Sequence, residues 1–378
     1  MNKIIYRIGE ISQIFSGGDR PKVCSDVRTA ECSIPIFSNG LDEDGLYGYT
    51  NKAQIEGDCI TVSARGANIG VVFYRDEPFL PIVRLLSIVP DRNKIDSKYL
   101  YYYFKTDKII GTGSAQPQLT IPFFQKKKIF VYENLATQQK IAHILSRYDE
   151  AIENNNKRIK LLEQMAQNLY KEWFVRFRFP GYENCEFENG IPVGWKYKNL
   201  FDVVNVTYGY AFTSELFCDD ESLNPVVRIR DILDNYTKTF TSEECSDKYI
   251  IKENEILIGM DGIFHMCMWN GEKAYQNQRV VKLTAKTEVY SNYFLFLAVQ
   301  PQIKFWEQTI AGTTVAHLGD KHLKRINVLI PSDDILKQAT IKFNLLMKQK
   351  NSLFKANKNL VKQRDLLLPR LMSGKIEV

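Results

Sequence analysis

The sequence lacks the patterns typical of a metal site, a membrane span or a secreted protein. Its seven cysteines are odd in number and scattered, without a CxxC or Cys/His spacing that would hold zinc. No apolar run approaches the ~18 residues that a membrane span needs, and the N-terminus shows no signal-peptide pattern. We therefore expect a cytoplasmic protein with reduced thiols, no metal site and no membrane association.

Motifs of catalysis are also missing. The chain contains no Walker-type phosphate loop, no GxGxxG after a strand, no HExxH, no GxSxG elbow and no Asn/Asp-Pro-Pro-aromatic motif of an amino-methyltransferase. Its four histidines lie far apart in the sequence. Asp219, Asp220 and Glu221 could pass for paired carboxylates, but such a loop cluster is more often solvated surface. We expect no catalytic residue and no cofactor in this chain.

The composition is that of an ordinary soluble globular chain large enough for more than one domain. Of its 378 residues, 44% are hydrophobic and 25% are charged. The net charge of +6 is unevenly spread, because Lys and Arg concentrate in residues 337–370, where Asp365 is the sole acid. A basic helix can face nucleic acid, although a solvated face or an acidic protein partner explains it equally well.

Two long stretches have the pattern of coiled-coil helices. Residues 137–174 contain no Pro or Gly, and apolar residues recur every three and four positions, with Asn155 as the interruption. A helix of this length would be about 55 Å long. The second stretch ends before Pro369 and carries a seven-residue column that begins at Ala339. Its predicted start at Ser332 and that of the first helix at Asn134 are plausible N-caps.

Laid antiparallel, the two helices match end to end. Leu145 then faces Leu367, Trp173 faces Ala339, and Asn155 faces Asn357, which would fix the register. The alternative is that the two stretches are unrelated core helices. The residues that we expect to pair the helices and dock partners are Leu145, Ile152, Asn155, Ile159, Leu162, Trp173, Leu346, Leu353, Asn357, Leu360 and Leu367.

The segments before the two helices repeat each other at an offset of 192 to 200 residues. Arg65-Gly66 matches Asp261-Gly262, and Gln118-Leu119 matches His317-Leu318. At the helix starts, Gln138 and Ile141 match Gln338 and Ile341. Within the first module we expect strands over residues 6–15, 34–40, 60–63, 71–74, 83–89 and 126–131 and a helix over residues 99–104. The pattern predicts an α+β protein with two tandem mixed α/β modules, separated by two long antiparallel coiled-coil helices, and a pseudo-two-fold internal repeat.

Polar residues on predicted loops and strand ends suggest binding rather than catalysis. Arg reads guanine and Asn or Gln reads adenine by paired hydrogen bonds in the major groove, and Lys neutralises phosphates. Any one of these residues, taken alone, is more often ordinary surface, but their repetition in both modules favours DNA. The candidate DNA-binding residues are Arg65, Asn68, Arg84, Gln116, Gln118, Lys127, Arg228, Arg230, Asn277, Arg279 and Lys324.

In this order, several short motifs resemble the specificity subunit of type I restriction-modification systems. They are Gly66-Ala-Asn-Ile-Gly70, Gln138-Gln-Lys-Ile141, Leu169-Tyr-Lys-Glu-Trp-Phe174, Ile191-Pro-Val-Gly-Trp-Lys196 and Arg364-Asp-Leu-Leu-Leu-Pro-Arg-Leu-Met-Ser-Gly374. The resemblance implies target-recognition domains at residues 1–133 and 195–331, each reading half of a split target in double-stranded DNA. Residues 134–178 and 332–378 would be the spacer helices, the second with a C-terminal tail, and residues 179–194 would be a linker.

The resemblance also implies which partners carry out the chemistry. Two methyltransferase subunits would dock on the helices and restriction subunits would join them, so that S-adenosylmethionine, ATP and Mg²⁺ would belong to those partners. The chain departs from the family at the helix entries, Asn134-Leu-Ala-Thr137 and Ser332-Asp-Asp-Ile335, which replace a proline-rich entry. A stand-alone nuclease or methyltransferase with a divergent site, and a coiled-coil scaffold, remain as alternatives.

Overall fold

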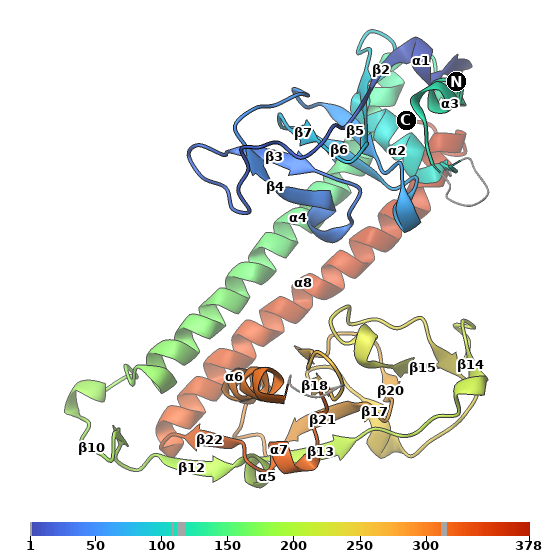
Figure 1. The fold of residues 1–378 in the computed structure, drawn as a ribbon. Helices are drawn as coiled ribbons and strands as arrows, with labels where there is room; N and C mark the ends of the chain where they lie inside the picture. The colour runs from blue at the N-terminus through green and yellow to red at the C-terminus, as the bar shows by residue number, and fades with distance from the viewer. Residues whose placement is uncertain (1, 108, 112–117, 311–315) are drawn as a thin grey trace. The chain divides into compact units, whose positions relative to one another are not determined.

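The computed structural model describes residues 2–107, 109–111, 118–310 and 316–378, and the chain divides into two compact units (Figure 1). Unit 1 consists of Met1–Asn154 with Asn357–Val378, and unit 2 consists of Asn155–Ala356. Each unit combines small sheets, short helices and part of both long helices, so the expected α+β class is confirmed. The finer division at residues 133, 178, 194 and 331 stays a prediction.

Unit 1 is built on a four-stranded antiparallel sheet of order β2-β8-β5-β6. A three-stranded sheet β4-β3-β7, in which β3 and β7 are parallel, and the antiparallel pair β1-β9 complete it. The elements in chain order are β1 (Lys3–Arg7), α1 (Ile8–Ile11), β2 (Ser12–Ser16), β3 (Ile34–Phe37), β4 (Leu46–Thr50), β5 (Cys59–Val62), β6 (Val72–Arg75), β7 (Leu80–Pro81), β8 (Leu86–Pro90), α2 (Ser97–Thr106), α3 (Ile121–Gln125) and β9 (Lys128–Tyr132). All four residues of β5 are buried, as expected for a central strand with both faces covered.

Unit 2 repeats this plan with a longer outer sheet. The strand order β13-β21-β18-β19 corresponds to the four-stranded sheet of unit 1, β12-β22 corresponds to β1-β9, and the outer sheet is β14-β16-β15-β20-β17. The elements are β12 (Lys196–Asn199), α5 (Leu200–Val203), β13 (Val204–Tyr208), β14 (Phe217–Cys218), β15 (Asn224–Val227), β16 (Phe240–Thr241), β17 (Ile250–Ile251), β18 (Ile256–Gly259), β19 (Met266–Met268), β20 (Ala274–Gln276), β21 (Val280–Ala285), α6 (Asn292–Ile310), α7 (Asp320–Leu323) and β22 (Asn327–Ile330). The predicted internal repeat is therefore confirmed.

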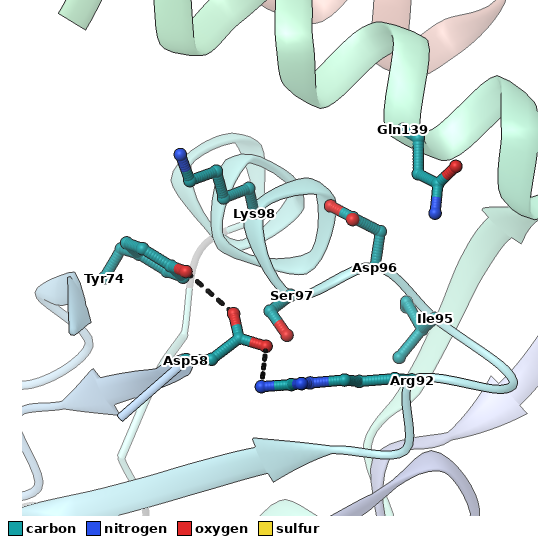
Figure 2. Close-up of a pocket in the computed structure, with 8 residues that line it drawn as sticks. All are labelled: Asp58, Tyr74, Arg92, Ile95, Asp96, Ser97, Lys98 and Gln139. Carbon is teal, nitrogen blue, oxygen red and sulfur yellow. Dashed lines mark hydrogen bonds and ion pairs between the residues drawn. The ribbon is translucent and has the colours of Figure 1, made fainter. Parts of the chain in front are cut away.

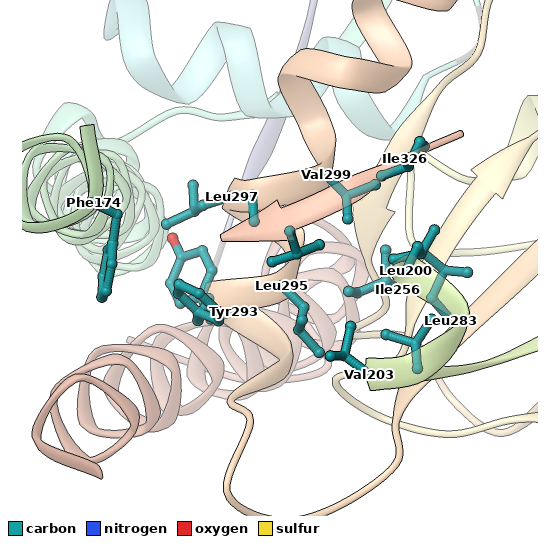
Figure 3. Close-up of a cluster of buried hydrophobic side chains, with 14 of the residues drawn as sticks. Phe174, Leu200, Val203, Ile256, Leu283, Tyr293, Leu295, Leu297, Val299 and Ile326 are labelled. Carbon is teal, nitrogen blue, oxygen red and sulfur yellow. The ribbon is translucent and has the colours of Figure 1, made fainter. Parts of the chain in front are cut away.

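The core of unit 2 is rich in aromatic and β-branched residues. Figure 3 shows Leu200, Ile256 and Leu283 packed near Leu295 and Ile326, so that the sheet, α5 and α6 share one apolar cluster. The predicted linker contributes to this core, because the Phe179 side chain is only 5% exposed. The linker also contains a small antiparallel hairpin formed by β10 (Phe187–Glu188) and β11 (Ile191–Pro192).

Two long helices carry the predicted coiled-coil patterns. α4 (Leu135–Tyr170) has 36 residues and continues into a π-helical turn at Lys171–Val175, and α8 (Asp333–Ser373) has 41 residues. The Asn134 Oδ1 atom accepts a hydrogen bond of 2.8 Å from the Ala136 backbone N–H, which supports its capping role. The predicted end of the second helix before Pro369 is wrong, because α8 passes through Pro369 to Ser373.

Within each unit the two helices run antiparallel. In unit 2, Glu163 pairs with Lys350 at 3.2 Å, and the Lys342 ammonium lies 5.8 Å from the centre of the Trp173 ring. Moving along α4 from Glu163 to Trp173 therefore corresponds to moving back along α8 from Lys350 to Lys342, as in an antiparallel pair. In unit 1 the Asp149 carboxylate pairs with the guanidinium of Arg364 from the other end of α8.

The predicted pairing residues are buried or half-buried on both helices. Leu145 shares the unit 1 core with Leu367, and Trp173 shares the unit 2 core with Ala339, as the antiparallel alignment predicts. Asn155 belongs to unit 2 and Asn357 to unit 1, so their pairing stays a prediction. The remaining seam residues, all buried or half-buried, are Ile152, Ile159, Leu162, Leu346, Leu353 and Leu360.

Two predicted strands differ from the structure. Residues 6–15 are not one strand, because α1 interrupts them between β1 and β2. The strand expected over residues 83–89 begins only at Leu86, because Val83 and Arg84 form a turn with positive φ. Nothing in β-branched content alone distinguishes a strand from such a turn.

The predicted alignment of the two helix starts is shifted by two residues. Ile141 is fully buried whereas its predicted match Ile341 is 70% exposed. The buried pairs Ile141 and Ala339, and Leu145 and Phe343, are each 198 residues apart, and so are the caps at Asn134 and Ser332. The predicted alignment paired identical residues that do not occupy equivalent places. The buried face of a helix accepts different apolar residues at one position, so identical residues need not be equivalent.

Candidate nucleic-acid interface

One edge of unit 1 gathers several candidate DNA-binding residues on adjacent loops. Arg65 and Gln118 form an isolated antiparallel bridge, and the Arg65 Nη2 atom lies 3.5 Å from the Gln118 Oε1 atom. Asn68 follows three residues after Arg65, at the end of a single 3-10 turn, Gly66–Asn68. Gln116 lies outside the described residues. The structure therefore brings Arg65, Asn68 and Gln118 together, as the sequence predicts for residues that act on one ligand.

Arg84 joins this edge through a turn with an unusual backbone. Val83 and Arg84 have φ values of 53° and 58°, a left-handed conformation that is uncommon outside glycine, above all for β-branched Val. The Val83 N–H donates to the Gly18 carbonyl at 2.8 Å, and the Arg84 N–H donates to the Gly17 carbonyl at 3.0 Å. The Arg84 side chain is exposed and free to reach a ligand.

A residue that the sequence argument missed, Asn39, links these loops. Its Nδ2 donates to the Val83 carbonyl at 2.7 Å, its Oδ1 accepts from the Ala64 N–H at 2.8 Å, and its carbonyl accepts from Asn68 Nδ2 at 3.1 Å. We call residues 38–40, 63–70 and 82–85 the unit 1 loop cluster. The motif Ser-Asn-Gly after a strand gave a turn signal, but nothing in it indicated three partners distant in the sequence.

Unit 2 repeats the bridge with different side chains. Asp261 and His317 form the isolated antiparallel bridge that corresponds to that of Arg65 and Gln118, and the Asp261 Oδ1 atom lies 2.7 Å from the His317 Nδ1 atom. The other carboxylate oxygen of Asp261 lies 3.4 Å from Arg279 Nε. The same backbone position therefore carries an arginine and an amide in unit 1, but an acid and an imidazole in unit 2.

Arg84 and Arg279 occupy equivalent places. The Gly17 N–H donates to the carbonyl of the residue after Arg84 at 2.8 Å, and the Gly209 N–H donates to the carbonyl of the residue after Arg279 at 3.2 Å. Arg84 lies two residues before β8 and Arg279 lies directly before β21, and these strands hold the same place in the two four-stranded sheets. An exposed arginine at this place is thus a shared feature of the two units.

Arg228 and Asn277 lie beside Arg279 in unit 2, whereas Arg230 points to solvent. The Asn277 N–H donates to the Val227 carbonyl at 3.1 Å, which places Arg228 next to Asn277. The Arg228 guanidinium lies 5.4 Å from the centre of the Phe217 ring, and its Nε is buried without a partner among the described residues. The Arg228 backbone N–H donates to the nearby Asp231 carboxylate. Burial raises the pKa of Asp231, and this effect exceeds the lowering by the Thr237 hydrogen bond.

The two candidate lysines lie elsewhere in their units. Lys127 is at the junction of α3 and β9, with its Nζ 3.0 Å from an Asp107 carboxylate oxygen. Lys324 follows α7, with its Nζ 2.6 Å from an Asp320 carboxylate oxygen. Both ammonium groups therefore have a carboxylate partner within their own unit, and the structure does not bring them into the loops that carry the arginines.

A polar hollow of about 260 Å³ lies apart from the loop cluster in unit 1 (Figure 2). Its central carboxylate, Asp58, accepts from the Tyr74 hydroxyl at 2.7 Å and pairs with Arg92 at 2.6 Å. Burial is the larger cause and the hydrogen bond to Asp58 the smaller cause of a raised pKa of Tyr74. The phenol therefore stays a hydrogen-bond donor. These groups stabilise one another and form no part of the candidate interface. The lining residues are Asp58, Tyr74, Arg92, Ile95, Asp96, Ser97, Lys98 and Gln139.

The described ranges lack the features of a metal site and of a membrane-spanning helix. No group of three or more His, Cys, Asp and Glu side chains in those ranges could hold a metal ion. No helix among them combines the length and the apolar character needed to cross a membrane.

Comparison with known proteins gives a consistent result over both repeats. A family model described as the type I restriction modification DNA specificity domain matches residues 3–164 and again residues 192–363. The MjaIX specificity subunit of a type I restriction enzyme from Methanocaldococcus jannaschii is 28% identical over 372 residues, covering 92% of this chain and 80% of that protein. The MjaVIII specificity subunit of the same organism is 26% identical over 414 residues, covering 99% and 93%.

A solved structure supports the fold. The S subunit of a type I restriction-modification system from M. genitalium superposes with a TM-score of 0.64 at 18% identity, covering 98% of this chain and 96% of that one. At this identity the match concerns the arrangement of helices and strands, not the side chains on the loops.

Proposed function

We propose, from the premise that this chain belongs to the type I restriction modification DNA specificity family, that each unit reads one half of a bipartite target in double-stranded DNA. The family consists of non-catalytic specificity subunits, and this chain has their role in DNA sequence specificity. The Arg65, Arg84 and Asn68 side chains of unit 1 contact one half-site, and Arg279, Asn277 and Arg228 of unit 2 contact the other.

The observation that carries this proposal is the pair of equivalent bridges with unlike side chains. Arg65 and Gln118 offer several hydrogen-bond donors, which suit the acceptors of guanine or the mixed edge of adenine. Asp261 adds a carboxylate, which accepts from cytosine or adenine amino groups, at the same backbone position in unit 2. One backbone plan with two sets of side chains supports reading of two different half-sites.

The long helices dock partners and set the distance between half-sites in this proposal. Two methyltransferase subunits bind along α4 and α8, and restriction subunits join the complex. S-adenosylmethionine, ATP and Mg²⁺ act in those partners. The continuity of α4 over 36 residues and of α8 over 41 residues supports a stiff spacer.

Deleting one heptad from each helix tests the spacer role. Seven residues remove about 10 Å of helix, which equals about three base pairs of DNA. We expect the complex with its methyltransferase subunits to methylate targets whose gap is shorter by about this amount. The assay measures methylation of duplexes that differ only in gap length. An unchanged gap preference would contradict the spacer role.

Exchange of unit 2 residues tests the independence of the two units. Replacing residues 195–331 by those of a relative should change the bases recognised in one half of the target and leave the other half unchanged, because each unit has its own core. Sequencing of methylated sites gives the recognised target. A change in both halves would show that the units do not read independently.

A further inference from the structure

Asn39 connects its own loop to two others that hold candidate base-contacting residues, Arg84 on one and Arg65 and Asn68 on the other. Its side-chain amide joins the turn before Arg84, through the Val83 carbonyl at 2.7 Å, to the segment before Arg65, through the Ala64 N–H at 2.8 Å. Its backbone carbonyl accepts from Asn68 Nδ2 at 3.1 Å. Asn39 therefore uses both ends of its amide and its carbonyl to fix the mutual positions of Arg65, Asn68 and Arg84.

The turn that Asn39 holds is strained. Two consecutive non-glycine residues, Val83 and Arg84, adopt positive φ, a conformation that is unfavourable for any residue other than glycine. Such a conformation persists only where surrounding groups hold it, and strained residues cluster at functional sites. Here the N–H groups of the turn are held by Gly17 and Gly18, and its Val83 carbonyl is held by Asn39.

The corresponding turn of unit 2, residues 277–280, contains no residue with positive φ. Within it, the Asn277 Oδ1 atom accepts from the Arg279 N–H at 3.4 Å, and the Asn277 carbonyl accepts from the Val280 N–H at 2.9 Å. The position two residues after β15, which corresponds to Asn39 after β3, is Ile229, an apolar residue packed beside Gly259. The link between loops through an asparagine is thus a property of unit 1.

We propose that Asn39 is a positioning residue for DNA reading by unit 1, and that it sets the arrangement of Arg84 relative to Arg65 and Asn68. This inference rests on the proposed function, because it assumes that the unit 1 loop cluster contacts bases. Asn39 itself need not touch DNA, since both ends of its amide are already occupied.

Asn39→Asp tests the positioning role selectively. Aspartate keeps an oxygen that accepts from the Ala64 N–H, but places a second oxygen against the Val83 carbonyl where the donor was. The turn with Arg84 should be released while Arg65 keeps its place. The full chain, assembled with its methyltransferase subunits, is used to select duplexes from a randomised pool. Arg84→Ala and the double variant are selected in parallel.

Asn235→Asp provides a matched control. Asn235 is a half-buried loop asparagine of unit 2 whose Oδ1 accepts from the Asn270 N–H at 2.7 Å and whose Nδ2 donates to the Leu233 carbonyl at 3.4 Å. Aspartate keeps the first hydrogen bond and loses the second, as in Asn39→Asp. The unfolding midpoint of each variant is measured by circular dichroism. The control shows whether the same change in a loop away from the unit 1 loop cluster relaxes base preference.

We expect Asn39→Asp to relax a subset of positions in one half of the target, with discrimination falling about five- to hundredfold there. Arg84→Ala should relax the same positions, and the double variant should relax no more than either. A target unchanged by Asn39→Asp, a loss spread over both halves, or additive losses in the double variant would overturn the proposal. If Asn39→Asp loses the preference and also has a lowered unfolding midpoint, Asn39 has a structural role and not a positioning role. A wild-type complex that selects no bipartite target would instead refute the proposed function.

Discussion

Truncation of Phe343 should destabilise unit 2 selectively. The Phe343 side chain is fully buried, and its ring centre lies 6.4 Å from that of Phe174, 6.1 Å from that of Tyr293 and 6.4 Å from that of Phe294. Phe343→Ala loses the transfer free energy of a buried ring, leaves a cavity and breaks three aromatic contacts. We expect a loss of about 4 kcal/mol in the free energy of unfolding of unit 2.

Tryptophan fluorescence isolates this effect, because all four tryptophans belong to unit 2. With a urea m-value of about 2 kcal/mol/M, a loss of 4 kcal/mol moves the fluorescence midpoint down by about 2 M. Leu145→Ala, at the equivalent buried position of unit 1, should cost about 2–5 kcal/mol. It should move the circular dichroism transition more than the fluorescence midpoint. The tryptophans are Trp173, Trp195, Trp269 and Trp306.

A surface neighbour gives the control for helix propensity. Leu345→Ala removes a side chain that is 56% exposed on the same helix, and should change the free energy of unfolding by less than about 0.5 kcal/mol. The reasoning is refuted if Phe343→Ala shifts the fluorescence midpoint no more than Leu345→Ala. Equal fluorescence shifts for Leu145→Ala and Phe343→Ala would show that the two cores do not unfold as separate units.

Three further predictions follow from buried or paired charges. Arg75→Met should lower the free energy of unfolding of unit 1 by about 2–4 kcal/mol, because the guanidinium donates to Thr61 Oγ1 at 3.1 Å in the interior. Thermal unfolding followed by circular dichroism measures this loss. A loss below about 0.5 kcal/mol would contradict the prediction. Burial, followed by nearby cations, lowers the pKa of His322. The folded chain therefore binds this proton less well than the unfolded chain, and the stabilisation is present above about pH 6.5, the ordinary histidine pKa, and is lost as the pH falls below it. Urea titrations at pH 5 and pH 8 should show this difference, and His322→Gln should reduce it. Arg279→Ala should lower discrimination about five- to hundredfold in the second half-site alone, and duplex selection that shows equal loss in both halves would contradict it.

Most of the architecture was predictable from the sequence because it depends on periodicity. Apolar residues at helical spacing through residues 137–174 gave the helix that includes α4, and the order of matched segments gave the repeat. The end of α8 was not predictable from Pro369. A proline removes one backbone donor, but the buried Leu368, Leu371 and Met372 on both sides of it stabilise the helix through their packing in the unit 1 core.

The candidate interface was predictable only in part. Arg65 and Gln118 were chosen from residue type and repetition, and the structure places them together. Asn39 was missed because its role depends on contacts with residues about 25 to 44 positions away, which no local pattern encodes. The role of the lysine candidates stays a prediction, and a run of Lys does not reveal that Lys127 is paired with Asp107.

The division of unit 1 into Met1–Asn154 and Asn357–Val378 has a consequence for protein synthesis. The ribosome finishes the whole of unit 2 before it makes Leu371, whose carbonyl accepts from the Tyr132 hydroxyl at 2.9 Å. The N-terminal part therefore keeps an open apolar face until residues 357–378 are made, although it is translated first. Released chains that end before residue 357 should consequently expose this face to chaperones and proteases, whereas their unit 2 portion should resist digestion.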